Sequence, residues 1–100
     1  MRRILVSQRV DILFDRSERR DALDQKLTAL LSFIDAIVLP VPNYLVQNNK
    51  LCAWLLENNA DGVVLSGGND LGEAPERDET EFQLMNYAKL HKKPLLGICR

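Results

Sequence analysis

The sequence has 100 residues, of which 46% are hydrophobic and 27% are charged, a balance typical of one small globular domain. The net charge of -1 and the scattered basic pairs exclude a nucleic-acid-binding stripe, and no apolar run approaches the ~18 residues of a membrane span. Two cysteines without a dense framework favour a reducing, cytoplasmic setting, and a single histidine without a C-x-x-C pair gives no support for a metal or another cofactor.

Four apolar runs without alternation predict strands that are buried on both faces of a parallel sheet. They cover residues 4–7, 36–39, 62–66 and 95–98. Helical patterns separate them at residues 21–34, 47–59 and 78–92. The order β-α-β-α-β-α-β predicts a three-layer α/β/α fold with a parallel sheet of the flavodoxin-like type. Residues 15–21 are expected to be a polar, charged connection, and residues 71–77 an irregular acidic loop.

In the first helix, apolar residues recur at steps of three and four, which predicts one buried stripe. Asp21 or Ser17 is available as its N-cap, and Leu27→Ala or Leu30→Ala should damage the fold. In the second helix, Cys52 lies on the apolar stripe, so we expect a small core residue there.

The third helix is expected to begin with a capping box. Asp78 would accept a hydrogen bond from the N3 amide, while Glu81 would reach back to the cap. His91 falls in the last turn, where a histidine interacts favourably with the terminal carbonyls, and we favour that structural role over catalysis.

The last strand runs into the sequence Gly97-Ile98-Cys99-Arg100. A glycine two residues before a nucleophile is typical of a sharp strand-to-helix turn, as in G-x-S-x-G, and here the motif reads G-x-C-x. This pattern alone indicates a nucleophilic Cys99 and a structural Cys99 about equally. A buried cysteine that closes a core strand is the alternative, since free cysteine is among the most buried residue types.

The third strand ends in a double-glycine loop, Gly67-Gly68. If the third and fourth strands are neighbours, this loop lies beside Cys99, and the amides of Gly68 (or Gly67) and Arg100 could stabilise an oxyanion. Arg9, with Gln8, follows the first strand and could contact a substrate, although a solvated loop is an equal alternative. For Tyr44, packing over the sheet is favoured over ligand contact.

Three segments together resemble the class I glutamine amidotransferase-like family, and within it the γ-glutamyl hydrolase branch that includes γ-glutamyl-γ-aminobutyrate hydrolases. They are residues 62–70, Arg77-Asp78-x-x-Glu81, and Pro94-Leu95-Leu96-Gly97-Ile98-Cys99-Arg100. Ser7-Gln8-Arg9 and Arg20-Asp21 also look like that branch, so the resemblance spans essentially the whole chain.

The resemblance implies that Cys99 attacks a γ-glutamyl amide to give a glutamyl thioester, with Gly68 and Arg100 as oxyanion donors. In this family a histidine and a glutamate complete the triad downstream of the nucleophile, beyond Arg100. His91 should lie at the opposite end of the sheet from Cys99 and is not the base. We therefore expect residues 1–100 to be the amino-terminal half of one domain, inactive and marginally stable alone.

The expected partner is a small γ-glutamyl substrate, with γ-glutamyl-γ-aminobutyrate or a γ-glutamyl nucleotide amidate as examples, and we leave a homodimer open. Asn69, Asp70, Glu73 and Arg77 are candidates to select its non-glutamyl half. Three alternatives remain: a glutaminase subunit that passes ammonia to a synthase, a non-catalytic flavodoxin-like binding module, and a catalytically dead half-domain that serves as a structural partner. Fast alkylation of Cys99 relative to Cys52 would separate a nucleophile from a core thiol.

Overall fold

The computed structural model describes residues 1–98. The strands and helices, in chain order, are β1 Arg2–Val6, β2 Arg9–Leu13, the 3-10 helix η1 Phe14–Arg16, β3 Glu18–Ala22, α1 Gln25–Phe33, β4 Ala36–Pro40, the 3-10 helix η2 Asn43–Asn48, α2 Leu51–Asn58, β5 Gly62–Leu65, α3 Pro75–Leu90 and β6 Leu95–Gly97. None of the helices in this part of the chain is both long and apolar enough to cross a membrane.

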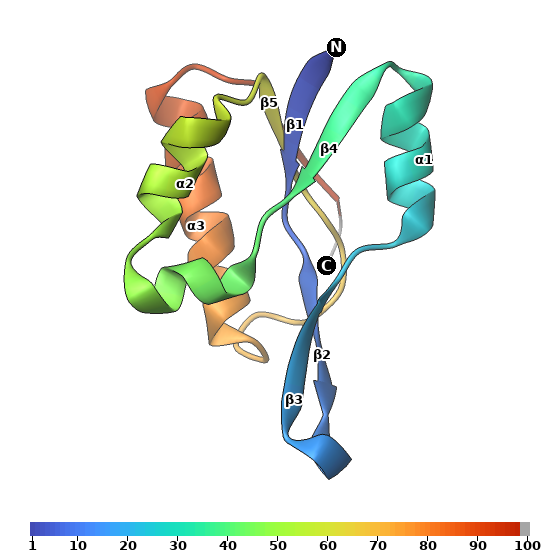
Figure 1. Cartoon of the computed structure of the whole chain (residues 1–100), viewed down its shortest axis with the longest axis vertical. Coiled ribbons are helices and arrows are strands. Elements are labelled where there is room, and N and C mark those ends of the chain that lie inside the picture. Colours follow the sequence, from blue (N-terminus) through green and yellow to red (C-terminus); the bar gives the residue numbers. More distant parts are fainter. Residues whose placement is uncertain (99–100) are drawn as a thin grey trace.

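The centre of the molecule is a four-stranded parallel sheet with the strand order β4-β1-β5-β6. Helices α2 and α3 lie on one face and α1 on the other, so the sheet is the middle of three layers (Figure 1). The predicted α/β fold with a parallel sheet is therefore confirmed. After β1 the chain forms β4 on one side of it, then crosses over to form β5 and β6 on the other side. This is the strand order of doubly wound flavodoxin-like folds.

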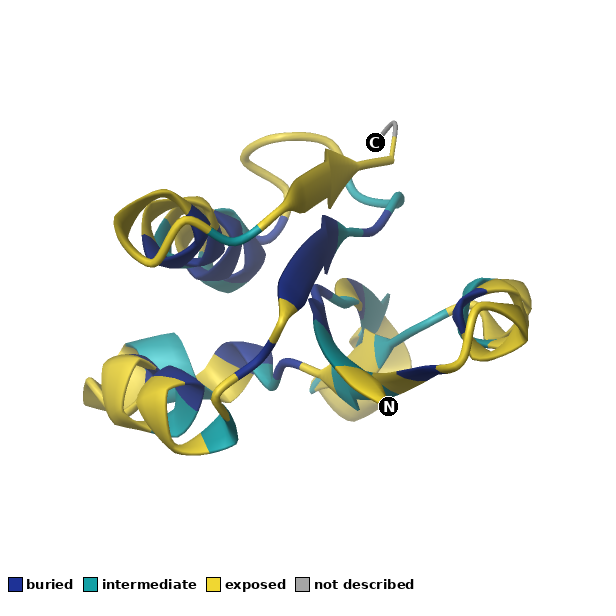
Figure 2. Cartoon of the chain, turned by 90° about the horizontal axis from the view of Figure 1, so that it is seen from above, coloured by how far each residue is buried: buried dark blue, intermediate teal, exposed yellow. Residues whose placement is uncertain are grey.

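Alternate side chains of the central strands enter different cores, as the two-residue period of a strand requires. Leu5 and Val63 pack against α2 and α3, whereas Val6 and Val64 pack against α1. Strand β5 is buried, while the edge strand β6 is exposed along its length (Figure 2). Burial on both faces explains why the central strands were recognisable as uninterrupted apolar runs.

An antiparallel hairpin of β2 and β3 extends beyond the carboxyl ends of the sheet strands (Figure 1). The expectation of only a polar, charged connection over residues 15–21, without a strand, was wrong. Strand β3 has the sequence Glu-Arg-Arg-Asp-Ala and carries almost no apolar pattern. It forms because η1 turns the chain, with Ser17 in the left-handed region at a φ of 51°, and because distant polar side chains hold the hairpin in place.

The predicted helix starts were also wrong in part. Helix α1 begins later than expected, and its N-cap is Asp24, whose carboxylate accepts from the Lys26 amide at 2.8 Å. Helix α3 begins earlier, with Pro75 in its first turn, so Asp78 lies inside the helix and is not its N-cap; its carboxylate accepts from the Gly72 amide at 2.9 Å. A proline is well suited to this position because its missing N–H would be unpaired anyway. The region expected as the second helix is divided between η2 and α2.

Four expectations about burial do not hold. The last strand, expected to be buried on both faces, is exposed along its length as β6, because it is an edge strand whose faces no described helix covers. Leu31, rather than Leu30, is the buried residue of α1, and the side chain of Leu30 is 62% exposed. Cys52 is exposed on α2 and is not a core residue. Tyr44 is 64% exposed and therefore does not pack over the sheet. For Leu30 and Cys52 the helical pattern was read correctly, but the side of the helix that faces the sheet was not. For Tyr44 the sequence carries no pattern that indicates which way the side chain points.

Candidate active site

The adjacency of β5 and β6 places the double-glycine loop beside the end of the last strand. Leu65 is paired with Gly97, and the Ile98 amide donates to the Leu65 carbonyl at 2.8 Å. The third and fourth strands of the sheet along the chain, β5 and β6, are therefore neighbours, as the expected position of the loop required. The predicted nucleophile Cys99 and the predicted oxyanion donor Arg100 lie outside the described residues.

A pocket of about 430 Å³ opens where these strands end. Its walls come from the start of the hairpin, the entry to α1, the double-glycine loop and the end of β6, and they comprise Arg9, Ala22, Leu23, Asp24, Leu27, Ser66, Gly67 and Ile98. The pocket lies at the carboxyl ends of β1 and β5, the neighbouring strands between which the chain reverses direction. Doubly wound sheets bind their ligands at this switch point.

The backbone of Gly68 has a φ of +97°, which a residue with a side chain rarely adopts. A Cβ at this position would lie 2.8 Å from Cδ and 3.0 Å from Cβ of Arg9. Both the backbone conformation and the close approach of Arg9 therefore require glycine. The loop can pass directly beneath the Arg9 side chain only because it carries no side chain of its own there.

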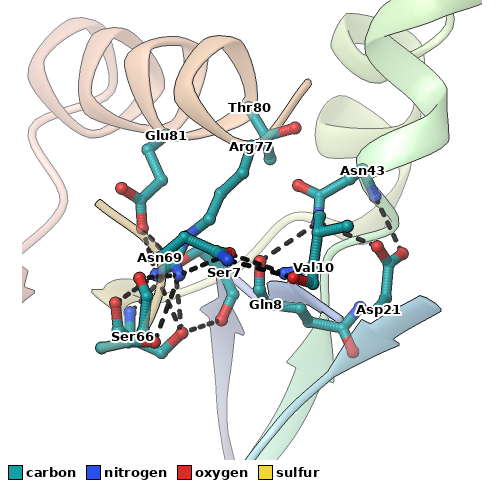
Figure 3. A network of polar contacts seen from close by, with 12 residues as sticks. Ser7, Gln8, Val10, Asp21, Asn43, Ser66, Asn69, Arg77, Thr80 and Glu81 are labelled. Carbon is teal, nitrogen blue, oxygen red and sulfur yellow. Dashed lines mark hydrogen bonds and ion pairs between the residues drawn. The ribbon is translucent and has the colours of Figure 1, made fainter. Parts of the chain in front are cut away.

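Arg77, from α3, lies beneath this loop and is completely buried (Figure 3). Its Nη1 atom donates to the carbonyls of Gly67, at 3.2 Å, and Gly68, and its Nη2 atom donates to the carbonyl of Ser66. One guanidinium thus holds three consecutive carbonyls of the loop. The expectation that Arg77 selects a substrate was wrong, because no part of its side chain reaches the surface.

The charge of Arg77 is balanced by Glu81, one helical turn further along α3, at 3.1 Å. The Ser7 hydroxyl donates to the same Glu81 oxygen at 2.6 Å and accepts from the Ser66 amide at 2.9 Å. The Ser66 hydroxyl donates to the Ser7 carbonyl at 2.5 Å. The ends of β1 and β5 are therefore joined to α3 by a buried network (Figure 3). The hydrogen bonds that Arg77 and Glu81 form with the loop and with Ser7 reduce the cost of burying this ion pair.

Asn69 connects the loop to the hairpin. Its Oδ1 atom accepts from the Val10 amide at 2.7 Å, and its Nδ2 atom donates to the Val10 carbonyl at 3.0 Å. The neighbouring Asp70 is exposed, and its amide donates to the carboxylate of Glu73. Of the residues expected to select a substrate, Asn69 thus has a defined role in the shape of the loop, while Asp70 lies at the surface.

Arg9 reaches the pocket from the first residue of the hairpin. Its Nε atom lies 3.1 Å from the Asp11 carboxylate, and the two side chains are 53% and 46% exposed. An ion pair that is this accessible to water contributes little to stability, so the guanidinium is available to another anion. Gln8 points elsewhere: its side-chain Nε2 atom donates to the Val41 carbonyl at 3.0 Å, and Gln8 does not line the pocket.

Two polar contacts on the other side of the hairpin fix its direction. Arg19 donates to the Glu76 carboxylate at 2.6 Å, and the Asp21 carboxylate accepts from the side chain of Asn43 at 2.9 Å. The hydrogen bond from Arg19 holds the pKa of the Glu76 carboxyl below its usual value, against the opposing effect of burial. The same pair raises the pKa of Arg19.

His91 does not line the pocket to which Ile98 contributes. It follows the last residue of α3, and its amide donates to the Tyr87 carbonyl at 3.0 Å. Its ring lies 4.7 Å from the Tyr87 ring, measured between centroids. The expected separation of His91 from Cys99 stays a prediction, because Cys99 lies outside the described residues.

Sequence reasoning missed the buried polar residues that support the loop, Ser7 and Ser66, and also Asn43, which holds the hairpin. The available signal was the position of two serines at the ends of two fully apolar strands, opposite an Arg-Glu pair spaced by one helical turn. Such i,i+4 pairs are common on solvated helix faces, so the spacing alone did not indicate burial. Within residues 1–98, no group of three His, Cys, Asp or Glu side chains is arranged to hold a metal ion.

A parallel α/β fold with a pocket at its switch point and a glycine loop along one wall defines the class of doubly wound enzymes and ligand-binding domains. The model of the Peptidase C26 family matches residues 10–100 of this chain. The chain therefore belongs to the Peptidase C26 family, a class I glutamine amidotransferase-like family. No curated protein gives a significant match. Membership indicates a cysteine-dependent amidohydrolase or glutamine amidotransferase-like activity.

Proposed function

We propose that residues 1–100 form the amino-terminal half of a cysteine-dependent hydrolase that cleaves γ-glutamyl amides. Cys99 is the proposed nucleophile, and the amides of Gly67 or Gly68 and of Arg100 are the proposed oxyanion donors. The observation that carries this proposal is the location of the glycine loop beside Ile98, on the wall of the pocket at the switch point. In the sequence, Cys99 follows Ile98 directly.

The loop geometry supports the oxyanion role. Neither Gly67 nor Gly68 donates its amide to another residue of the described part of the chain. The carbonyls that precede these amides turn toward Arg77 on the α3 side of the sheet. In a trans peptide the N–H points opposite to the C=O, so both amides turn away from α3. The pocket lies on that opposite side, where α1 covers the sheet.

The proposed reaction has two covalent steps. The Cys99 thiolate forms a bond to the γ-carbonyl carbon, and the tetrahedral oxyanion that results is stabilised by the backbone amides. The C–N bond then breaks, and the amine leaves with a proton from the general acid. Water attacks the glutamyl thioester, which releases glutamate and restores the thiol. The histidine and glutamate that manage these protons are proposed to come from sequence beyond residue 100.

The charges of the pocket suit a glutamyl group. Its wall carries one guanidinium, that of Arg9, and one carboxylate, that of Asp24. These two groups are complementary to the carboxylate and the ammonium of a glutamyl α-carbon, and an arginine is well suited to bind a carboxylate through two hydrogen bonds. Asp24 keeps an oxygen for this purpose, since its Oδ1 atom alone caps α1. Asp70, at the exposed end of the loop, is proposed to contact the non-glutamyl half.

The test uses the full-length protein with γ-glutamyl-γ-aminobutyrate and glutamine as substrates and glutamate release as the readout. Cys99→Ser should abolish release from whichever amide is cleaved. The matched control is Cys52→Ser, because Cys52 is an exposed thiol on α2 that does not line this pocket. A wild-type protein that releases no glutamate, or a Cys99→Ser variant that still does, would reject the covalent mechanism. Preference for glutamine would instead favour the alternative of a glutaminase subunit.

A further inference from the structure

The residue that shapes the glycine loop does not touch the pocket. Arg77 is 0% exposed and does not line the pocket. Its two terminal nitrogens are nevertheless directed at the carbonyls of Ser66, Gly67 and Gly68. A helix residue that only filled the core would not need a charge, and burying a guanidinium is costly unless it is paired and hydrogen-bonded.

We propose that Arg77 is a positioning residue for catalysis, which holds three successive loop carbonyls toward α3 and thereby directs the Gly67 and Gly68 amides into the pocket. This inference rests on the proposed function. Without the guanidinium, the two glycines have a wide choice of backbone conformations, and peptide units that can rotate lose the preorganisation on which oxyanion stabilisation depends.

Glu81 and Ser7 complete the set of side chains that holds the glycine loop in place. Glu81 supplies the negative charge that allows Arg77 to be buried, and its oxygen is fixed by the Ser7 hydroxyl at 2.6 Å. Ser7 follows directly after β1, so the loop that follows β5 is held from the neighbouring strand as well as by the helix. The orientation of the amides therefore depends on α3 and β1, which are both regular elements of the fold. A site supported in this way is more rigid than one formed by a loop alone.

The geometry requires arginine, not just a cation. The planar fork of a guanidinium can serve several acceptors at once, whereas a lysine ammonium is a compact point charge on a flexible stem. Arg77→Lys keeps the charge and the ion pair with Glu81 within reach. It cannot hold the carbonyls of Ser66 and Gly68 together, because in the native loop these are served by different nitrogens of the guanidinium.

The experiment compares Arg77→Lys with Arg19→Lys in the full-length protein. Arg19 is the matched control, since it also pairs with a glutamate of α3 but contacts none of the loop carbonyls. Hydrolysis of a γ-glutamyl amide gives kcat and KM. The rate of Cys99 alkylation by iodoacetamide is measured in a Cys52→Ser background. Alkylation of a thiolate creates no oxyanion and does not need the amides.

Arg77→Lys should lower kcat by about 100-fold, the usual effect of losing one oxyanion donor, with little change in KM or in the alkylation rate. Arg19→Lys should leave all three values nearly unchanged. Full activity of a folded Arg77→Lys protein would overturn the inference, as would a parallel loss of alkylation, because either result would place Arg77 outside the oxyanion geometry. If wild-type protein hydrolyses no γ-glutamyl amide, the proposed function fails as well.

A second variant covers the case in which Arg77→Lys does not fold. Ser7→Ala removes the hydroxyl that fixes Glu81 and accepts from the Ser66 amide, without removing a charge. It should lower kcat by about 10-fold, less than the loss of a full donor, at an unchanged alkylation rate. An unchanged kcat in a folded Ser7→Ala protein would contradict the proposed support of the loop.

Discussion

The Asn69 side chain is paired with both backbone polar groups of Val10, at 2.7 Å to the amide and 3.0 Å to the carbonyl. A side-chain amide thus takes the place that a neighbouring strand would occupy beside β2. The loop that follows β5 and the hairpin that follows β1 are joined at this point, although 59 positions separate the two residues in the chain.

Asn69→Ala should destabilise the protein by about 1–3 kcal/mol, because it leaves both Val10 groups without this partner in a partly buried place. Asn69 also has a φ of 50°, which asparagine tolerates better than alanine. Asn59→Ala is the matched control, since Asn59 has a φ of 44° and ends α2 at an exposed position. Urea denaturation measures both. Equal losses in the two variants would show that the bonds to Val10 contribute nothing beyond the backbone effect.

Comparing Gly68→Ala with Gly72→Ala separates two reasons for which a position requires glycine, a positive φ and a lack of space for a Cβ. Both residues have a positive φ, of 97° and 93°, so each variant pays a similar backbone cost of about 1–2 kcal/mol. Only at Gly68 would the new Cβ meet a neighbour, at 2.8 Å from Arg9 Cδ, whereas nothing lies within 4 Å at Gly72. Thermal unfolding should therefore show a larger loss for Gly68→Ala, by about 1 kcal/mol or more. Similar midpoints would contradict the close packing of Arg9 on the loop.

The Arg19–Glu76 pair makes the attachment of the hairpin depend on pH, and acid should weaken it. The pKa of Glu76 is lower in the folded state than in the unfolded chain, because Arg19 donates to its carboxylate. The pair therefore stabilises the fold above the unfolded pKa of about 4.3, and this stabilisation is lost as the pH falls through the folded value. Since the Arg19 side chain is 43% exposed, the contribution is small, at most about 1 kcal/mol.

Hydrogen exchange of the β3 amides, followed from pH 7 to pH 3, measures this effect after correction for the intrinsic rates. Protection should fall in the wild type toward the acid end, and Glu76→Gln should show lower protection at neutral pH with a flatter profile. A wild-type profile as flat as that of Glu76→Gln would show that the pair does not hold the hairpin.

The parallel sheet could be predicted from the sequence because its central strands are buried on both faces, which leaves uninterrupted apolar runs such as Leu5-Val6 and Val63-Val64. The hairpin could not be predicted. Four of the five residues of β3 are charged, and it is stabilised by Asn69, Glu76 and Asn43, which are distant in sequence. Local patterns contain no information about such partners.

The position of the candidate site could be predicted for a similar reason. The order of strands and helices alone places the ends of β5 and β6 at one edge of the sheet, and the double glycine marks the loop there. The support of that loop could not be predicted, because Arg77 and Glu81 have the spacing of an ordinary surface ion pair. Only the packing of α3 against the sheet shows that this face of the helix is buried.

Arg9→Met tests whether the guanidinium at the pocket binds the glutamyl carboxylate. Loss of a charge-assisted pair that binds substrate and transition state equally should raise KM by about 10–100-fold and leave kcat nearly unchanged. Arg20→Met is the matched control: Arg20 belongs to the same hairpin and has a similarly exposed ion pair, with Glu18 at 2.7 Å, but it does not line the pocket. Steady-state kinetics of the full-length protein on a γ-glutamyl amide give both constants.

If Arg9→Met and Arg20→Met raise KM equally, the effect comes from the charge of the hairpin as a whole, and Arg9 does not contact the substrate. If Arg9→Met lowers kcat instead, the side chain acts through the packing of Gly68 beneath it.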